Sequence, residues 1–264
     1  MTGRRRVLRS LLLGAVLVAG LAGPGRAAER PVVAAASDLQ FALEEIADAF
    51  AAETGLSVEL AFGSSGNFAR QIRQGAPFQM FMSADEDYVL DLARDGLTRD
   101  EGALYGLGRI ALVVPHGSPL KADASLDDLE AALADGRLSR FAIANPEHAP
   151  YGRRAEEALR HRGLWEAVAS RLVLGENVSQ AAQFATSGNA QGGIVAYSLA
   201  LSRPVSALGT FALVPQAWHS PLRQRMVLLN GAGHAAERFF DYVRQPAARA
   251  VLRRYGFALP GEAG

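Results

Sequence analysis

Short apolar runs alternate with segments of helical periodicity along this chain, and this alternation is the feature that most restricts its fold. The runs Val32–Ala36, Ser57–Phe62 and Gln79–Ser83 each have the length and composition of a strand. Apolar residues recur at helical spacing over Leu39–Phe50, and Ser37 stands where a helix N-cap is expected. Strands that alternate with helices predict an α/β fold with parallel, doubly wound sheets.

A second series of strands and helices follows the first. Its strands are expected at Arg109–Val114, Phe141–Ala144, Leu172–Leu174, Gly192–Ala196 and Met226–Leu229. A helix over Ser125–Asp135 is expected to begin with a capping box of Ser125 and Asp128. One continuous helix is expected over Ala235–Arg254.

Two α/β lobes fit this pattern better than one. Lobe 1 is expected to comprise residues 28–111 and 219–264, and lobe 2 to comprise residues 112–218. Each lobe would be a sheet flanked by helices. Two hinge crossovers, near Arg109–Val114 and Gln224–Leu228, would join them.

The segment Phe62–Pro77 places a turn of small residues between a strand and a helix. The apolar run ends in Gly63-Ser64-Ser65-Gly66, and a helical pattern follows at once. N–H groups at a helix start have no partner in the helix, and the helix dipole adds partial positive charge, so such a turn can hold an anion. A single turn of this kind is usually only a serine-capped helix start, so the interpretation depends on finding it again.

Four junctions share this construction and together predict an oxyanion site. They are Ala36-Ser37, Ser64-Ser65-Gly66, Pro150-Tyr151-Gly152 and Asn177-Val178. With two junctions in each lobe, closure would bring a partial charge on the order of +2 to one point, at about +0.5 for each N-terminus. Every such contact is a donor, and no carboxylate is expected there to accept a proton, so the ligand must be a deprotonated dianion. Sulfate, molybdate and tungstate fit this description, and hydrogen phosphate fits it less well.

The N-terminus has the order of a secretory signal peptide. Several arginines precede the apolar run Ser10–Gly23, and small residues follow it. We expect residues 1–27 to be removed on export. The chain contains no cysteine, so neither a lipid anchor nor a disulfide is expected. These features predict a soluble periplasmic protein.

The formal net charge of zero hides an acidic mature chain. Residues 1–27 contain five arginines and no acid, which leaves 22 basic residues against 27 acidic ones. A net charge of about −5 argues against nucleic acid as a partner. We expect a monomer without a cofactor, in which local dipoles hold any bound anion.

These segments carry a family resemblance over essentially the whole mature chain. The matching motifs are AAASD (Ala34–Asp38), FGSSGNFARQIRQGAPF (Phe62–Phe78), MFMSAD (Met80–Asp85), NPEHAPYGRRAEEAL (Asn145–Leu159), GENVSQA (Gly175–Ala181), GGIVAYS (Gly192–Ser198) and RRYGF (Arg253–Phe257). In these motifs the chain resembles the periplasmic molybdate-binding proteins of ABC transporters. The resemblance implies a two-lobed periplasmic-binding-protein fold of type II. It also implies delivery of molybdate, and of tungstate, to a permease in the inner membrane.

The resemblance also implies a set of ligand contacts. By motif these are Ser37, Ser65, the phenolic hydroxyl of Tyr151 and the amide of Val178, which would meet the metal only through the oxygens of molybdate and never as direct ligands. Part of the family has a tyrosine directly after GIV, where this chain has Ala196. Tyr197 comes one place later and is expected to point away from the ligand, because side chains of a strand alternate between its faces. Asp38 is left out of the set, because a carboxylate would repel a dianion.

Two other classes of function stay open at this point. Ferric iron is the next ligand after sulfate, and it would need clustered tyrosine, histidine or carboxylate oxygens. A serine hydrolase would use Ser65 or Ser37, but Gly63-Ser64-Ser65-Gly66-Asn67 lacks the second glycine of a G-x-S-x-G turn. We therefore expect a binding protein and not an enzyme.

Overall fold

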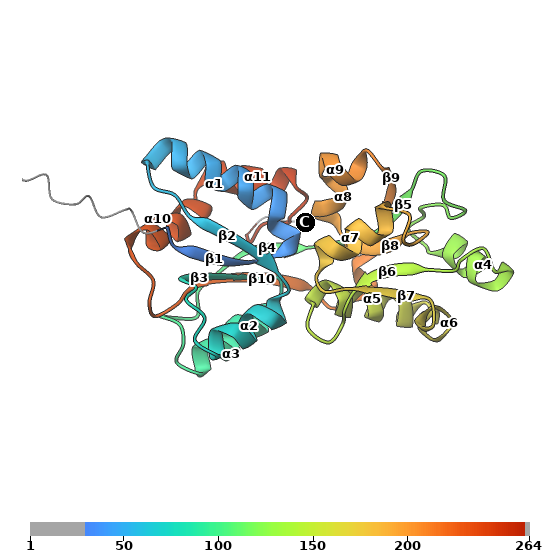
Figure 1. Cartoon of the computed structure of the whole chain (residues 1–264), viewed down its shortest axis with the longest axis horizontal. Helices are drawn as coiled ribbons and strands as arrows, with labels where there is room; N and C mark the ends of the chain where they lie inside the picture. The colour runs from blue at the N-terminus through green and yellow to red at the C-terminus, as the bar shows by residue number, and fades with distance from the viewer. Residues whose placement is uncertain (1–29, 262–264) are drawn as a thin grey trace, which may run out of the picture.

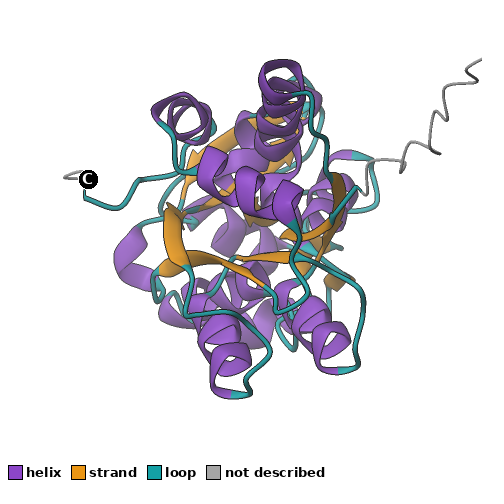
Figure 2. Ribbon diagram, turned by 90° about the vertical axis from the view of Figure 1, so that its left-hand side faces the viewer, coloured by secondary structure: helices purple, strands orange, loops and turns teal. Residues whose placement is uncertain are grey.

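The computed structural model describes residues 30–261 and shows two lobes side by side (Figure 1). The predicted signal peptide, residues 1–27, lies outside the described residues. Each lobe contains a five-stranded sheet. Seen along the long axis, helices lie on both sides of the strands (Figure 2). In the part of the chain that is described, no helix has the length and apolar character that crossing a membrane requires.

The sheet of the first lobe has the order β2-β1-β3-β10-β4. Its strands are β1 (Val32–Ala36), β2 (Glu59–Gly63), β3 (Met80–Ser83), β4 (Ala103–Gly108) and β10 (Leu222–Leu228). The strand β1 pairs in parallel with β2 and β3, whereas β10 runs antiparallel to β3 and β4. The helices of this lobe are η1 (Ser37–Leu39), α1 (Gln40–Thr54), α2 (Ser65–Arg73), α3 (Glu86–Arg94), α10 (His234–Val243) and α11 (Pro246–Arg254).

The sheet of the second lobe repeats this arrangement with the order β7-β6-β8-β5-β9. Its strands are β5 (Ile110–Pro115), β6 (Phe141–Ala144), β7 (Leu172–Gly175), β8 (Gly193–Ala196) and β9 (Gly209–Leu213). The strand β6 is parallel to β7 and β8, and β5 is antiparallel to β8 and β9. The helices of this lobe are α4 (Asp127–Asp135), α5 (Pro150–His161), α6 (Trp165–Ala169), α7 (Val178–Thr186), α8 (Tyr197–Leu201) and α9 (Arg203–Ser206), and η2 (Gln216–Trp218) follows.

The chain passes twice between the two sheets. It leaves the first sheet at the end of β4, Gly108, and enters the second at Ile110; it returns between Leu213 and Leu222. The predicted fold class, two α/β lobes that are each a sheet flanked by helices, is confirmed. The expectation of parallel sheets is wrong, because β10 and β5 run antiparallel to their neighbours and both sheets are mixed. The predicted residue limits of the lobes stay a prediction, and we note that Ile110 and Ala111, assigned to lobe 1, pair with β8 of the second sheet.

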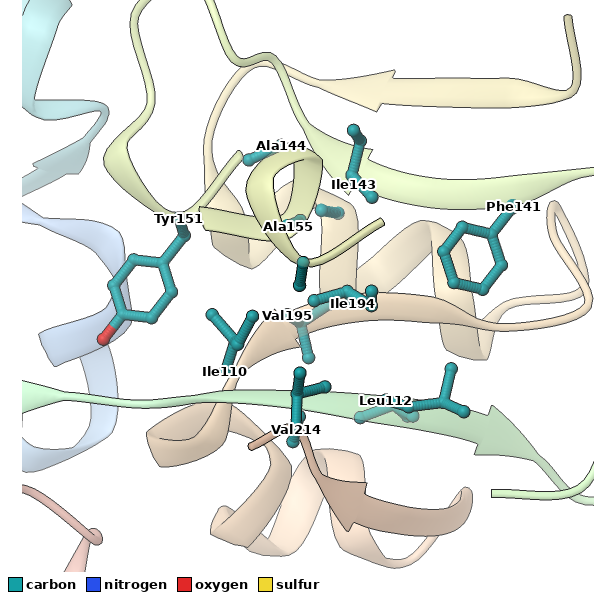
Figure 3. Packing of buried hydrophobic residues seen from close by; sticks show 14 of the residues in the cluster. Ile110, Leu112, Phe141, Ile143, Ala144, Tyr151, Ala155, Ile194, Val195 and Val214 are labelled. Atoms are coloured by element: carbon teal, nitrogen blue, oxygen red, sulfur yellow. The ribbon is translucent and has the colours of Figure 1, made fainter. Parts of the chain in front are cut away.

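Different apolar clusters form the cores of the two lobes, and the cluster of the second lobe also includes Ala36, Ala84 and Leu222 of the first. In the first lobe Phe50 of α1 packs edge-on against Phe239 and Tyr242 of α10, with ring centroids 5.2 and 5.4 Å apart. In the second lobe Phe141 and Ile194 belong to a cluster of strand side chains (Figure 3). Tyr151 lies at the border of that cluster, and its ring points away from the strands, towards the ribbon of the first lobe (Figure 3).

Three local predictions differ from the structure. The start of α4 is held by Asp123, whose carboxylate accepts from the amides of Asp127 and Asp128, so the predicted Ser125 capping box is wrong. The C-terminal helix is broken into α10 and α11, because Pro246 has no N–H to continue the first helix and starts the second. The strands β4 and β9 were not predicted.

Candidate functional site: a small cavity between the lobes

Ser37, Ser65, Tyr151 and Val178 all line one small cavity between the lobes. Its volume is about 10 Å³, which is room for little more than one water-sized group and far below the roughly 300–1,000 Å³ of pockets that hold drug-sized ligands. The complete lining is Ala36, Ser37, Asp38, Gly63, Ser64, Ser65, Ala84, Ala149, Pro150, Tyr151 and Val178. Both lobes therefore contribute, and the space suits a small ion rather than a metabolite.

Strand pairing explains why residues so distant in sequence meet here. In the first lobe the last residues of β1 and β2, Ala36 and Gly63, are paired in register. In the second lobe the last residues of β6 and β7, Ala144 and Gly175, are paired in the same way. The carboxyl ends of parallel strands lie at one edge of a sheet, where ligands of open α/β folds bind. The two edges face each other across the cavity.

The first lobe contributes two buried hydroxyl groups. The Ser65 hydroxyl oxygen accepts from the amide of Ala84 (3.0 Å), and that of Ser37 accepts from the amide of Ser179 in the other lobe (3.2 Å). A hydroxyl that accepts from an amide still has its own hydrogen to donate. Ser37 does not cap α1 as predicted, because a 3-10 turn, η1, precedes that helix. Both serines are thus placed as donors.

The second lobe contributes the starts of two helices. Val178 is the first residue of α7, and Asn177 caps this helix by accepting from the amide of Gln180 (3.0 Å). Tyr151 is the second residue of α5, after Pro150. Amides in the first turn of a helix have no partner within the helix and carry the positive end of its dipole. These two amides are therefore available to an anion.

The Tyr151 hydroxyl belongs to a buried polar group that joins the lobes. It donates to Asp38 Oδ2 (2.9 Å), and Gln224 Nε2 donates to both the same Oδ2 (2.8 Å) and the Tyr151 oxygen (2.9 Å). Burial raises the pKa of the Asp38 carboxyl to about 7. Burial, followed by the proximity of Asp38, raises the pKa of Tyr151 well above its usual value. In this structure Asp38 thus accepts the phenolic hydrogen that was expected to reach the ligand, and the part of Tyr151 left for an anion is its backbone amide.

Two residues of this group were not among the predicted site residues. Asp38 lines the cavity, so the expectation of a lining without a carboxylate is wrong. The sequence signal was its position next to Ser37, which we discounted because of charge repulsion. Gln224 lies on β10, 186 residues from Asp38 in the chain, and no local pattern pointed to it.

The lining contains no cationic side chain. None of the lining residues is lysine, arginine or histidine, and Asp38 is the lone carboxylic acid among them. Across the described residues 30–261, no group of three His, Cys, Asp or Glu side chains could hold a metal ion. An anion in this cavity would be held by hydroxyl and amide dipoles.

Further contacts around the cavity hold the lobes together. Gly66 donates its amide to the backbone oxygen of His148 (2.9 Å), and Arg154 pairs with Asp85 (2.9 Å). Each of these contacts joins one lobe to the other. Asn67 also donates to Glu176 across the gap. The structure is therefore a closed form, in which the lobes shut the cavity from both sides.

A histidine near the cavity does not form a hydrolytic site with the predicted serines. His148 Nδ1 lies 3.0 Å from the hydroxyl of Ser64, whereas the hydroxyls of Ser65 and Ser37 pair with backbone amides. The nearest oxygen of Glu176 is 3.5 Å from His148 Nε2, and the Glu176 side chain is 59% exposed. A base needs a closer and better-oriented acid to activate a serine. We interpret this group as another contact between the lobes.

Tyr197 lies outside the cavity lining, but for a reason other than strand alternation. It is the first residue of α8 and not part of β8. Its ring packs against Phe211, with centroids 5.8 Å apart. Tyr197 and Tyr151 therefore do not share this cavity.

A larger and more open groove borders the cavity at Ser37. Its volume is about 490 Å³, and it is lined mainly by apolar and amide side chains such as Phe41, Gln183 and Leu208. The converging donors distinguish the small cavity from this groove.

Comparison with known proteins gives full-length matches. The family described as bacterial extracellular solute-binding protein matches residues 31–258. The molybdate-binding protein ModA of Rhodobacter capsulatus is 35% identical over 260 residues, which are 97% of this chain and 99% of that protein. ModA of Azotobacter vinelandii is 35% identical over 246 residues, covering 92% and 95%. The solved periplasmic molybdate-binding protein of Azotobacter vinelandii superposes with a TM-score of 0.78 at 30% identity, covering 88% of this chain and 100% of that one.

Proposed function

Because this chain belongs to the bacterial extracellular solute-binding proteins, in the group that contains the ModA proteins, we propose that it binds molybdate for uptake by an ABC transporter. Tungstate, an ion of the same shape and charge, is the second ligand. In this proposal the protein works in the periplasm and hands its ligand to a permease in the inner membrane. It carries the ion without transforming it.

The observation that carries the proposal is the meeting of neutral donors from both lobes around one cavity without a cationic side chain. Ser37 and Ser65 offer hydroxyl groups, and the helix starts at Tyr151 and Val178 offer amides. Such donors suit an anion with oxygens in several directions, because each oxygen can accept from a different element. A tetrahedral oxyanion meets this requirement.

In this proposal the protein binds the ion tightly because the lobes close around it. An open form would present two half-sites, one in each lobe, and the ion would bind to one before the other closed over it. Water would be excluded on closure, and the hydrogen bonds to the ion would be stronger in the less polar surroundings. The closed face would then be the form that the permease recognises.

Sulfate and ferric iron are the alternative ligands. Sulfate offers the same charge and acceptors, so only the size of the cavity can select against it. Ferric iron prefers clustered tyrosine, histidine and carboxylate oxygens. The cavity offers one carboxyl and one phenol, which pair with each other, and this composition favours an oxyanion over iron.

Titration calorimetry of the purified chain tests the proposal. Molybdate and tungstate should bind tightly, sulfate at least about 100-fold more weakly, which is a difference of about 2.7 kcal/mol, and phosphate and ferric citrate without measurable heat. Equal affinities for sulfate and molybdate would show that the size of the cavity does not discriminate between the two ions. Binding of ferric citrate in place of molybdate would replace the proposed function with iron transport.

A further inference from the structure

Two oxygens of the buried polar group, Asp38 Oδ1 and Gln224 Oε1, have no hydrogen-bond partner among the described residues, and Asp38 is the one of the two residues that lines the cavity. Asp38 is 1% exposed and lines the cavity. Its Oδ2 accepts from Tyr151 and Gln224, while its Oδ1 is buried without a hydrogen-bond partner among the described residues. A buried carboxyl oxygen without a partner is costly. Because Oδ2 is already occupied, Oδ1 is the atom left for a ligand in the cavity.

No cation faces this carboxyl to compensate a negative charge. The ionisable groups beside it are two tyrosines, Tyr151 of α5 and Tyr105 of β4. The elements packed on η1 are α1, α7, α8 and β2. The helix α7 has no ionisable side chain, the one in α8 is Tyr197, and the acids Glu44 of α1 and Glu59 of β2 are exposed.

The arginines of the neighbouring elements have partners elsewhere. On α5, Arg153 donates to the Tyr88 hydroxyl and Arg154 pairs with Asp85. On β10, both Arg223 and Arg225 pair with Glu86, on the side away from Gln224. Arg109, at the first crossing, has a buried Nε without a hydrogen-bond partner in the described part of the chain and disfavours a positive charge on nearby His219, but it is not among the groups that shift the pKa of Asp38. A charged Asp38 would thus face a dianion with no cation beside it.

We propose that Asp38 is a proton-linked residue of the oxyanion site, which binds the dianion as a neutral carboxylic acid through Oδ1–H. The proton comes from solvent and bonds to Oδ1, while Oδ2 keeps its two donors. The acid then adds one hydrogen-bond donor to the ion in place of a repelling charge. This inference rests on the proposed function, because it concerns the ion bound at the same site.

Burial favours the protonated form of the Asp38 carboxyl even before an ion is bound. Desolvation raises the pKa of Asp38 to about 7, although its bonds to Gln224 and Tyr151 lower it. A dianion in contact would raise the pKa further, because like charge disfavours the carboxylate. Below about pH 7 the acid is already neutral and binding takes up no proton; above it, binding must take up one. Affinity should therefore fall as pH rises, by up to about tenfold for each unit above the free-state pKa.

Calorimetric titration with molybdate from about pH 6 to about pH 9, in pairs of buffers with different ionisation enthalpies, tests the inference. Wild type should show no proton uptake at the acidic end and about one proton at the alkaline end, with the Kd rising in parallel. In Asp38→Asn the side-chain oxygen can still accept from Tyr151 and Gln224, and the side-chain NH₂ group takes the position of Oδ1 as a donor. It should bind with a Kd that is independent of pH and without proton uptake. Glu44→Gln, a change to an exposed acid on α1, is the matched control and should keep the wild-type pH profile.

Three outcomes would overturn the inference. They are a pH-independent wild-type Kd, the absence of proton uptake at the alkaline end, and a loss of binding in Asp38→Asn as large as in Asp38→Leu. The last result, with unfolding temperatures that match wild type, would mean that the site needs a carboxylate to accept a proton from the ion. Failure of wild type to bind molybdate at any pH would instead contradict the proposed function itself.

Discussion

The two lobes build their halves of the cavity from different parts of the chain. The first lobe contributes side chains, the hydroxyls of Ser37 and Ser65 and the carboxyl of Asp38. The second contributes mainly backbone, at the helix starts of Tyr151 and Val178. One half of the site should therefore be sensitive to the identity of its residues, and the other half to the course of its main chain.

The two halves of the site are also held in place differently, one through its side chains and the other through its main chain. In the first lobe each serine oxygen is held by an amide, from Ala84 or Ser179. In the second lobe Pro150 and the Asn177 cap set where the two helices begin. A donor on the main chain cannot be removed by truncating a side chain, so substitutions can separate the two contributions.

The largest effect is expected from Gly66→Ala, which acts on both halves at once by opposing closure. A Cβ at this position would lie 2.6 Å from the backbone oxygen of His148 in the other lobe and 2.8 Å from the Tyr88 hydroxyl. Overpacking of this kind costs about 3 kcal/mol at its upper end, which is roughly a 100-fold loss in affinity for molybdate. Calorimetry measures the loss, and small-angle scattering should show that added molybdate no longer compacts the protein.

Gly231→Ala is the matched control for this change, because a Cβ there meets no atom within 4 Å. It should bind molybdate as wild type does. Unchanged affinity in Gly66→Ala would mean that the ion binds without the closed contact between Gly66 and His148.

Next in size is Ser65→Ala, which tests the side-chain half alone. The variant loses a donor to a charged ligand, worth about 2 kcal/mol or roughly a 30-fold rise in the Kd. The amide of Ala84 also loses its acceptor, so the unfolding temperature of the ligand-free protein should fall. Ser64→Ala provides the comparison, since its hydroxyl pairs with His148, and it should weaken binding less. An equal or larger loss of affinity in Ser64→Ala would mean that Ser64, and not Ser65, donates to the ion.

Val178→Pro tests the backbone half by deleting one amide. Proline is tolerated at the first position of a helix, and Asn177 has the extended conformation that a following proline requires (φ −146°, ψ 176°). The helix should therefore remain, and circular dichroism would show this. We expect the Kd to rise roughly tenfold, which corresponds to about 1.4 kcal/mol. Wild-type affinity would exclude the amide of residue 178 from the site.

The smallest effect on binding is expected from Val178→Ala, which keeps the amide. The Kd should change less than about threefold, whereas the free energy of unfolding should fall by about 1–2 kcal/mol because the side chain is buried. Chemical denaturation and calorimetry on the same preparation measure both quantities. A large loss of affinity here would show that the valine side chain shapes the cavity, and the contrast between the lobes would be weaker than we infer.

The fold was predictable from the sequence where periodicity was strong. The strand β1 has the predicted bounds, Val32–Ala36, because its apolar run is bounded by Pro31 on one side and by Ser37-Asp38 on the other. The strands β4 and β9 were missed because both are edge strands with glycine, two in β4 and one at the start of β9. The cap of α4 was misassigned because Asp123 reaches it from a turn that precedes a left-handed Leu126 (φ 61°), which no sequence pattern announces.

More of the candidate site could be predicted from the sequence in the first lobe than in the second. Hydroxyls at strand ends indicated the two junctions of the first lobe from residue types alone, whereas the choice of Ser37 and of Ser65 over Ser64 as contacts followed from the family resemblance. Val178 came only from the family resemblance, since a backbone contact leaves no trace in the residue type. The pairing of Asp38 with Gln224 depends on a β10 strand 186 residues away, and such a contact becomes visible only in three dimensions.

The position of β10 inside the first sheet, between β3 and β4, has a consequence for the order in which the molecule matures. While the chain emerges from the ribosome, β4 has no neighbour to pair with until β10, Leu222–Leu228, has been made. The second sheet needs only one uninterrupted stretch, from Ile110 to Leu213. The lobe that is started first is therefore finished last, and the nascent protein stays incomplete until nearly its whole length has been translated.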